Sequence, residues 1–457
     1  MTSATEIATR VRARKISPVE VVEEALRRVE DHNPRINAIV TLNPRALDEA
    51  KEVERRLASG EPPGLLSGVP VGIKDVTQVA GLRTTFGSPL YRDHVPEEDA
   101  VVVTRLRQAG AIILGKTNTP EFAAGGNTWN DVFGRTRNPW NPERSAGGST
   151  GGGAAALASG MIALAEGTDL GGSLRIPASF CGVVGLRPSP GLVPTWPSDW
   201  VWDTLQVTGP MARTAEDVAL MLRAMAGAFS PLNQPSAGRD FIGAVRRGPR
   251  SGCRVGYCPD IAGIGIDPAV EAVCRRAAER LTEQGARVDL IEFDLSEGRD
   301  AFLDLRGLWF VTWMHDRLDR IDELGVNVRN NVSAGLQGTV PDIARAERIR
   351  GRIWSRFRRF FEEYDYFLTP TMAVSPFPVE QNYPDTVAGR EMRTYVDWIA
   401  PTFLLSLTGL PVCSVPCGMD PEGLPVGIQI VGWLGGEEAV LALAGRVQQE
   451  NPIGLPV

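Results

Sequence analysis

The apolar residues of the N-terminal part follow two different periods. Residues 17 to 32 open with SPVE, a capping box with proline in the first turn, and continue with apolar residues at helical spacing. Residues 68 to 75 read GVPVGIKD, in which valine and isoleucine alternate with small residues, as in a β-strand. The patterns predict an amphipathic helix over 17–32, followed by a strand with one apolar face and one face that carries Lys74.

Helical and extended patterns keep alternating further along the chain. A helix-like stretch from residue 99 ends at Gly110 and is followed by the strand-like run at 111–114. Strand, helix and strand are again predicted over 254–260, 268–284 and 287–293. Residues 229–252, rich in proline, glycine and polar residues, are predicted to be a surface connection. This alternation indicates the α/β class.

A basic segment near 344–361 also has helical periodicity. Six arginines share it with the apolar residues Ile349, Ile353, Phe357 and Phe361. We interpret it as a helix with a solvated basic face over a core stripe, and not as a nucleic-acid or membrane surface. The arginines are Arg345, Arg348, Arg350, Arg352, Arg356 and Arg358.

Charge and composition narrow the expected partners and location. The chain has 48 basic and 55 acidic residues, a formal charge of −7, which argues against a nucleic-acid or anionic-membrane surface and favours small, uncharged substrates. There is no leader-like apolar segment at the N-terminus and no run of about 18 apolar residues. A cytoplasmic location is therefore expected, with the six cysteines reduced.

Metal and imidazole chemistry find little support in the sequence. Cys413 and Cys417 could form a metal pair, but no second cysteine or histidine pair stands at zinc-ligand spacing. We predict a strand with two buried thiols instead, with no metal and no cofactor. Only His32, His94 and His315 are present, and none lies in a motif, which disfavours hydrolytic mechanisms that use histidine.

Two motif matches are rejected by their context. Residues 110–117, GAIILGKT, match the phosphate-binding pattern G-x-x-x-x-G-K-[ST]. Such a loop must follow a strand and open a helix, whereas the middle of this one is itself strand-like. Residues 147–151, GGSTG, match the nucleophile elbow, which requires a downstream acid and histidine. Only His315 lies downstream, in a helix-like setting.

Three motifs together give the most specific signal. They are GIKD at 72–75, GGSTGG at 147–152 and TDLGGSLRIP at 168–177, with Lys74 and Ser149 75 residues apart and Ser149 and Ser173 24 apart. In order and spacing the chain resembles the amidase signature family. The resemblance covers roughly residues 5 to 450, including GRTRNPWNP, ASFCGVVGLRPS and FLTPT. It departs at Thr150, where a second serine is usual, and at Ser406, where asparagine is common.

The motif residues suit acyl-transfer chemistry. A serine nucleophile needs a base, and a lysine can serve if burial keeps its amine neutral near pH 7. The resemblance implies that Ser173 attacks, Ser149 relays the proton through a cis peptide turn, and Lys74 is the base. It also implies an oxyanion hole of backbone amides. These belong to Leu170, Gly171, Gly172 and Ser173.

The roles of neighbouring residues are less specific. Asp169 and Arg175 flank the nucleophile and are expected to support its loop by charge-assisted hydrogen bonds, without a catalytic role. The family often lines its substrate pocket at the positions of Gly125, Gly126 and Asn127, which are either substrate contacts or simple turn residues.

The resemblance implies a fold and a domain plan. It implies one α/β/α domain over residues 1–457, with a large mixed central sheet covered by helices on both faces. N-terminal helices are expected over about 1–60, the catalytic core over 65–225, a smaller peripheral α/β part over 250–365, and a return to the core over 366–457.

The implied activity is hydrolysis of a carboxamide through an acyl-enzyme, extending to carbamates and esters. The segment TWPSDWVW at 195–202 either lines the mouth of an apolar pocket, which would favour aryl or alkyl substrates, or packs as ordinary core. Two alternatives stay open: the glutamine-hydrolysing component of a tRNA-dependent amidotransferase, and a relative that only binds ligands. The expected partners are a small amide or carbamate and water, and the expected state is a monomer or homodimer.

Overall fold

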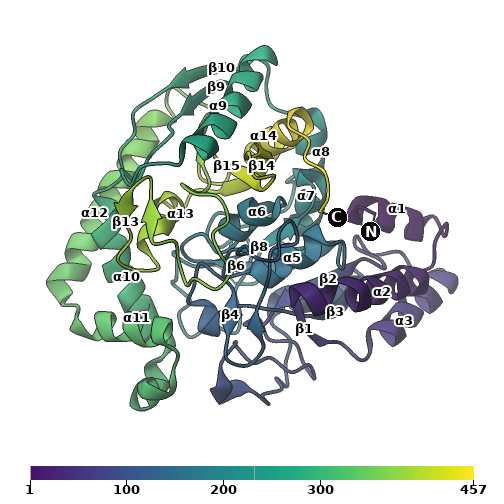
Figure 1. The fold of residues 1–457 in the computed structure, drawn as a ribbon. Coiled ribbons are helices and arrows are strands. Elements are labelled where there is room, and N and C mark those ends of the chain that lie inside the picture. Colours follow the sequence, from purple (N-terminus) through teal and green to yellow (C-terminus); the bar gives the residue numbers. More distant parts are fainter. Residues whose placement is uncertain (1, 231, 457) are drawn as a thin grey trace.

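The computed structural model describes residues 2–230 and 232–456, and within them eleven strands form one mixed sheet (Figure 1). In the order in which they pair, they are β1 (Ile39–Leu42), β3 (Ile112–Thr117), β2 (Pro70–Lys74), β6 (Leu164–Asp169), β8 (Val207–Ala212), β7 (Val184–Arg187), β14 (Val412–Met419), β15 (Pro425–Val431), β11 (Tyr366–Pro370), β9 (Arg254–Tyr257) and β10 (Arg287–Leu290). Pairing is parallel among β3, β2 and β6 and among β11, β9 and β10. It is antiparallel across the middle of the sheet.

Helices cover both faces of this sheet (Figure 1). They are α1 (Ala4–Arg12), α2 (Pro18–Ile36), α3 (Ala46–Ala58), α4 (Val101–Gln108), α5 (Gly151–Ala158), α6 (Arg175–Cys181), α7 (Ala215–Met225), α8 (Phe241–Arg247), α9 (Pro268–Glu283), α10 (Gly298–Trp313), α11 (Val326–Gln337), α12 (Val340–Phe360), α13 (Ala400–Ser406) and α14 (Glu437–Glu450). Shorter elements are the hairpins β4 (Trp129–Asn130) with β5 (Gly134–Arg135) and β12 (Thr386–Val387) with β13 (Arg390–Glu391), and the 3-10 helices Pro89–Tyr91, Glu121–Ala123, His315–Glu323 and Asp397–Ile399.

Alternate strand residues enter different apolar cores, as the pleat of a strand requires. On β3, Ile113 joins the core shared by α1, α4 and α7, whereas Ile112 and Leu114 join the core of α2, α3 and α5. On β11, Leu368 joins the first of these cores and Phe367 a third one, built with α10 and α12. The three-layer fold with a mixed central sheet, implied by the family resemblance, is confirmed.

The N-terminal helix begins as its sequence predicts. Ser17 Oγ accepts a hydrogen bond from the Val19 amide at 3.0 Å, and Glu20 Oε2 accepts one from the Ser17 amide at 3.0 Å. This reciprocal capping box satisfies amides that the first helical turn leaves free. The helix runs past its predicted end at residue 32 and stops at Asn37, whose φ of 55° is left-handed.

One predicted connection is wrong in part. Within residues 229–252 lies α8, which packs against α7 and α14. Asp240 caps it by accepting a hydrogen bond from the Gly243 amide at 2.9 Å, and Phe241 is buried. The short helix is stable because its apolar side chains enter the core, whereas the flanking glycine and proline residues dominate the sequence pattern.

The other secondary-structure predictions are confirmed. Strand, helix and strand follow as β9, α9 and β10, and β14 carries the two buried thiols of Cys413 and Cys417. In α12, Ile349, Ile353 and Phe357 are buried while most of its arginines are exposed or half-buried. Within residues 2–230 and 232–456 we find no helix with the length and apolarity that crossing a membrane demands.

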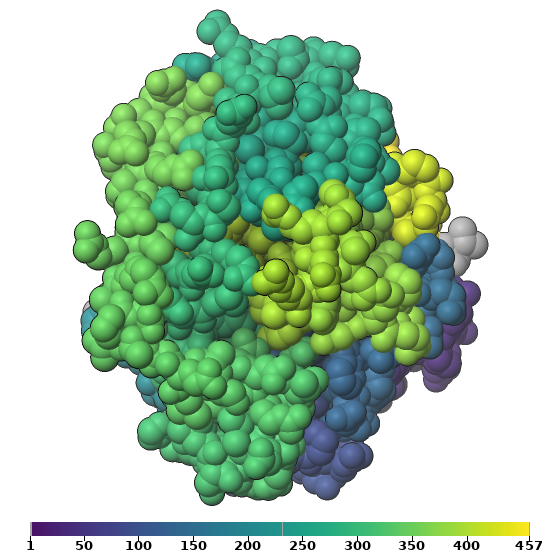
Figure 2. Space-filling model, turned by 60° about the vertical axis from the view of Figure 1, so that its left-hand side comes forward, coloured from purple at the N-terminus to yellow at the C-terminus, as the bar shows by residue number. Residues whose placement is uncertain are grey.

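Distant segments of the chain meet on the face shown in Figure 2. The yellow-green segment that follows β11 lies at the surface between the teal region of α9 and the green region of α11. Hydrogen bonds from Arg306 and Asn331 to Tyr395 join these parts underneath. This junction closes one side of the site described next.

Candidate active site

Lys74, the last residue of β2, lies at the centre of a buried polar cluster. Its Nζ donates hydrogen bonds to Ser149 Oγ at 2.6 Å and to Thr168 Oγ1 at 3.0 Å. Its backbone amide donates to Glu166 Oε2 on the adjacent strand β6 at 3.1 Å. Four side chains that are far apart in sequence are therefore joined in one dry cluster.

Burial changes the protonation of the Lys74 amine. Removal from water lowers the pKa of Lys74 to about 7, against the attraction of Glu166 and Asp169, which favours the charged form. The amine can therefore accept a proton near neutral pH, as a general base must. Desolvation also raises the pKa of Glu166, which lies beside it.

Ser149 lies in a turn that only glycine neighbours allow. The Gly148–Ser149 peptide bond is cis, as the resemblance implied. A Cβ at Gly148 would lie 2.8 Å from the Gly125 carbonyl oxygen, and one at Gly152 would lie 2.3 Å from the Asn118 amide nitrogen. Helix α5, which follows, is buried throughout and consists of glycine, alanine and one leucine. Small residues thus bring Ser149 close to the sheet and to Lys74.

Ser173 lies in the loop between β6 and α6. It is half-buried, whereas Lys74 and Ser149 are fully buried. The Thr150 amide donates a hydrogen bond to the Ser173 carbonyl at 3.2 Å, which joins the two serine loops. Ser149 and Ser173 line one cavity. The structure therefore brings the three sequence-predicted residues together, with Lys74 behind Ser149 and Ser173 facing open space.

Asp169 is the anchor of the Ser173 loop. Its carboxylate accepts hydrogen bonds from the amides of Gly172 at 2.9 Å and Leu174 at 3.1 Å. Arg175 donates to both carboxylate oxygens, at 3.0 and 2.9 Å, and Arg187 donates to one at 3.2 Å. Burial alone would raise the pKa of Asp169, but the two guanidinium groups hold it well below its usual range. These contacts fit the predicted supporting role of Asp169 and Arg175.

Removal of this anion should destabilise the fold strongly. We expect Asp169→Asn to lower the free energy of unfolding by about 3–5 kcal/mol, because two buried guanidinium groups lose their counter-ion. Urea denaturation at neutral pH measures the change. The folded pKa of Asp169 is depressed, so its stabilisation is present above the unfolded value of about 3.9 and is lost as the pH falls.

The control for this prediction is Asp240→Asn, which keeps a capping side chain at an exposed site. Little change in stability is expected there. A loss below about 1 kcal/mol for Asp169→Asn would show that the buried charges are balanced in another way.

The loop before Ser173 presents backbone amides at the cavity. Leu170, Gly171 and Ser173 line it. Gly172 has a φ of 126°, and a Cβ there would lie 2.3 Å from Thr402 Oγ1. The same hydroxyl donates a hydrogen bond to the Gly171 carbonyl at 2.7 Å. Since the Gly172 amide is already bonded to Asp169, the amides at 170, 171 and 173 are the ones available to a bound molecule.

The three predicted substrate contacts lie in different places. Gly125 lines the cavity. Gly126 packs against Trp398, whose Cζ2 would lie 2.5 Å from an added Cβ. The Asn127 amide donates hydrogen bonds to the carbonyls of Val379 at 2.9 Å and Gln381 at 2.7 Å. In this structure Gly125 alone of the three lines the cavity, and the Asn127 side chain holds the chain near residue 380.

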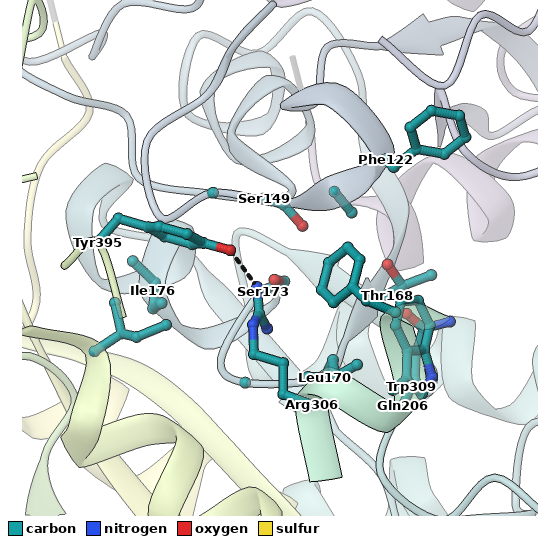
Figure 3. A pocket seen from close by; sticks show the side chains of 15 residues that line it. Phe122, Ser149, Thr168, Leu170, Ser173, Ile176, Gln206, Arg306, Trp309 and Tyr395 are labelled. Carbon is teal, nitrogen blue, oxygen red and sulfur yellow. Dashed lines mark hydrogen bonds between the residues drawn. The ribbon is translucent and has the colours of Figure 1, made fainter. Parts of the chain in front are cut away.

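Sequence motifs gave no sign of the remaining walls. They include Phe122, Gln206, Arg306, Trp309 and Tyr395 (Figure 3). Arg306 and Tyr395 are hydrogen-bonded and point toward the part of the pocket that holds Ser173 (Figure 3). The inner cavity is narrow, with room for about 20 Å³.

A wider cavity of about 920 Å³ adjoins the inner one. Both are lined by Phe122, Ala123, Thr168, Gln206 and Trp309, so they are continuous. The outer cavity is also lined by the segment 193–204, and it is more apolar than polar in its walls. The tryptophans at its walls are Trp196, Trp200, Trp202, Trp309 and Trp313.

The rejected phosphate-loop match is explained by the structure. Residues 112–117 form β3, and Lys116 is fully buried. Its Nζ donates hydrogen bonds to the Thr77 carbonyl and, at 2.8 Å, to Thr84 Oγ1. The lysine is therefore engaged inside the core and cannot reach a nucleotide. His315, which a nucleophile elbow would require, is exposed at the start of a 3-10 helix.

Comparison with known proteins agrees with this geometry. A family profile described as Amidase matches residues 20–441. An acylamidase of Rhodococcus erythropolis is 37% identical over 464 residues, which cover 98% of this chain and 95% of the relative. The A-type component of a glutamyl-tRNA(Gln) amidotransferase from Thermosynechococcus vestitus is 34% identical, with 95% of each chain covered.

Solved structures give the same result. A bacterial aryl acylamidase of the amidase signature family superposes with a TM-score of 0.92 at 29% identity, covering 99% of this chain and 96% of the other. A 6-aminohexanoate cyclic dimer hydrolase bound to its substrate has a TM-score of 0.88 at 28% identity, covering 100% and 98%. The chain belongs to the amidase signature family. It is a hydrolase of carbon–nitrogen bonds in non-peptide amides.

Proposed function

We propose that Ser173 is the nucleophile of this amidase, with Ser149 as proton relay and Lys74 as general base. The observation that carries the proposal is the 2.6 Å hydrogen bond from Lys74 Nζ to Ser149 Oγ, beside a cavity that both serines line. In the reactive state the neutral amine takes the Ser149 proton as Ser149 takes the proton of Ser173. Ser173 Oγ then bonds to the substrate carbonyl carbon.

The second half of the cycle reverses these transfers. The protonated Lys74 returns its proton through Ser149 to the leaving amine, the carbon–nitrogen bond breaks, and an acyl-enzyme remains on Ser173. Water, deprotonated by the same relay, attacks the ester and releases the acid. The amides of Leu170, Gly171 and Ser173 face the cavity and donate to the oxyanion in both steps. The Gly172 amide contributes by holding Asp169 and thereby the loop.

We assign the outer cavity to an aryl or alkyl part of the substrate. Its tryptophans offer broad apolar faces, and burying apolar surface contributes about 25 cal/mol per Å². The narrow inner cavity fits the reacting carbonyl and little else beyond a small acyl group. The same geometry suits carbamates and esters, since each presents a carbonyl and a leaving group.

The rival function is the glutaminase of a tRNA-dependent amidotransferase, one component of which is similar over most of this chain. The aromatic outer cavity favours the free amidase, because glutamine has no apolar group to fill it. We further propose a cytoplasmic monomer or homodimer that acts without a second kind of chain. The six cysteines are free and buried, as expected in a reducing compartment.

The test is a substrate panel with the purified protein alone. We expect p-nitroanilides and a p-nitrophenyl carbamate to be hydrolysed, with kcat/KM rising as the apolar leaving group grows, because more apolar surface is buried. Colour release reports these substrates and ammonia release reports glutamine. Turnover of glutamine alone would favour the amidotransferase function. Turnover of no substrate would contradict the proposed function.

A further inference from the structure

Arg306 is a buried cation in the inner cavity that the proposed mechanism does not use. It lies on α10, is 5% exposed and lines the same cavity as Ser149 and Ser173. Its Nε donates a hydrogen bond to Asn331 Oδ1 at 2.8 Å, and its Nη2 donates to the Tyr395 hydroxyl at 2.7 Å (Figure 3). Both partners are neutral oxygens.

Other buried arginines of this protein are paired with an anion. Arg175 and Arg187, both fully buried, lie within 2.9 and 3.2 Å of Asp169. Within the described residues, no carboxylate lies within 4.0 Å of Arg306, and no hydrogen bond uses its Nη1. A buried charge without a counter-ion is costly. Its retention here therefore requires a compensating contact.

The surrounding rings compensate only in part. The Arg306 guanidinium lies 4.9 Å from the Phe310 ring centroid, 5.6 Å from that of Tyr395 and 5.9 Å from that of Phe302. Cation–π contacts of this kind stabilise a charge by about 0.5–2 kcal/mol each, less than a desolvated ion pair. They also leave the fork of N–H donors free to meet a flat anion. The residues around Arg306 thus orient its guanidinium without neutralising it.

We propose that Arg306 binds a carboxylate carried by the acyl part of the substrate, with Asn331 and Tyr395 holding the guanidinium in place. This specificity rests on the proposed function. Arg306 and Trp309 are three residues apart on α10 and so lie on one face of the helix. Trp309 reaches the outer cavity as well, whereas Arg306 lines only the inner one. An aryl amine therefore occupies the outer cavity, and the acid-bearing acyl chain points inward.

The preferred substrates are then mono-amides of a short dicarboxylic acid with an apolar amine. The net charge of −7 suggested uncharged substrates, but a guanidinium a few ångströms away outweighs distant surface charge, which salt screens. The carboxylate would receive the unused Nη1 and share Nη2, in the bidentate geometry that guanidinium groups favour.

The experiment compares two p-nitroanilides that differ only in charge, glutaryl-p-nitroanilide and its methyl ester. The wild type should favour the free acid in kcat/KM by about 10- to 100-fold, the range of a hydrogen bond to a charged group. Arg306→Met should lose this preference. Asn331→Asp, which places a carboxylate beside the guanidinium, should lose it too while Arg306 remains. Arg306→Lys should keep part of it.

A binding measurement separates this inference from the proposed chemistry. Glutarate should bind to the Ser173→Ala protein in calorimetric titration and at least 10-fold more weakly when Arg306→Met is added. If the wild type hydrolyses both anilides without preferring the acid, and glutarate does not bind, the inference is wrong and the amidase function stands. If no anilide is hydrolysed, the proposed function is wrong, and the titration still decides whether Arg306 takes a carboxylate.

Discussion

Ser173→Ala should lower kcat for every anilide by about 10⁴- to 10⁶-fold, the largest effect of any single substitution that we expect. The hydroxyl supplies the only atom that bonds to the substrate carbon in the proposed mechanism. Its loss leaves binding and the backbone amides in place, so KM should change little by comparison. Steady-state hydrolysis of a p-nitroanilide, with mass spectrometry to detect the acyl-enzyme, measures both predictions.

The matched control is Ser159→Ala at the end of α5, where the hydroxyl donates only to the Ala155 carbonyl at 2.9 Å. This variant should keep its activity. Ser149→Ala should fall between the two, because the relay is removed but the nucleophile remains. A Ser173→Ala enzyme that kept a tenth of the activity or still formed an acyl adduct would exclude Ser173 as the nucleophile.

The second large effect concerns Lys74 and has a characteristic pH dependence. Lys74→Ala should reduce kcat by about 10³- to 10⁴-fold, the range of a lost general base. In the wild type, kcat/KM should rise with pH up to the pKa of Lys74, about 7, and then level off, because only the neutral amine accepts a proton. The pH profile of anilide hydrolysis tests this directly.

Lys74→Arg is the informative companion variant. A guanidinium stays protonated throughout the accessible range, so raising the pH should restore no activity. A wild-type profile that is flat between about pH 6 and pH 8, or an active Lys74→Arg enzyme, would assign the base to another group.

Most of the catalytic cluster could be predicted because its motifs are short and local. The alternation at 68–75 indicates the strand that ends at Lys74, and the glycines around Ser149 and Ser173 mark tight turns. Thr168 was missed although it stands in the same motif as Ser173, since a threonine is an ordinary residue on a strand. Its hydrogen bond to Lys74 depends on the pairing of two strands.

The walls of the pocket could not be predicted in the same way. Arg306 is part of an amphipathic helix pattern, and nothing in that pattern distinguishes a surface cation from a buried one. Asn331 and Tyr395 meet it only because α11 and the segment after β11 fold back over α10. Such contacts are set by the packing of whole elements, which hydrophobic periodicity does not determine. The short helix α8 was missed for a related reason, although Asp240 could have marked its start.

The buried helix α5 has a consequence for how this protein can change. Its glycine and alanine side chains touch neighbours at every position, so a larger residue there would push on both the Ser149 turn and the sheet that holds Lys74. Variation that alters substrate range is therefore confined to α10, the segment 193–204 and the chain around Tyr395. A library that diversifies those three regions and leaves α5 untouched should yield new selectivities on an unchanged reaction centre.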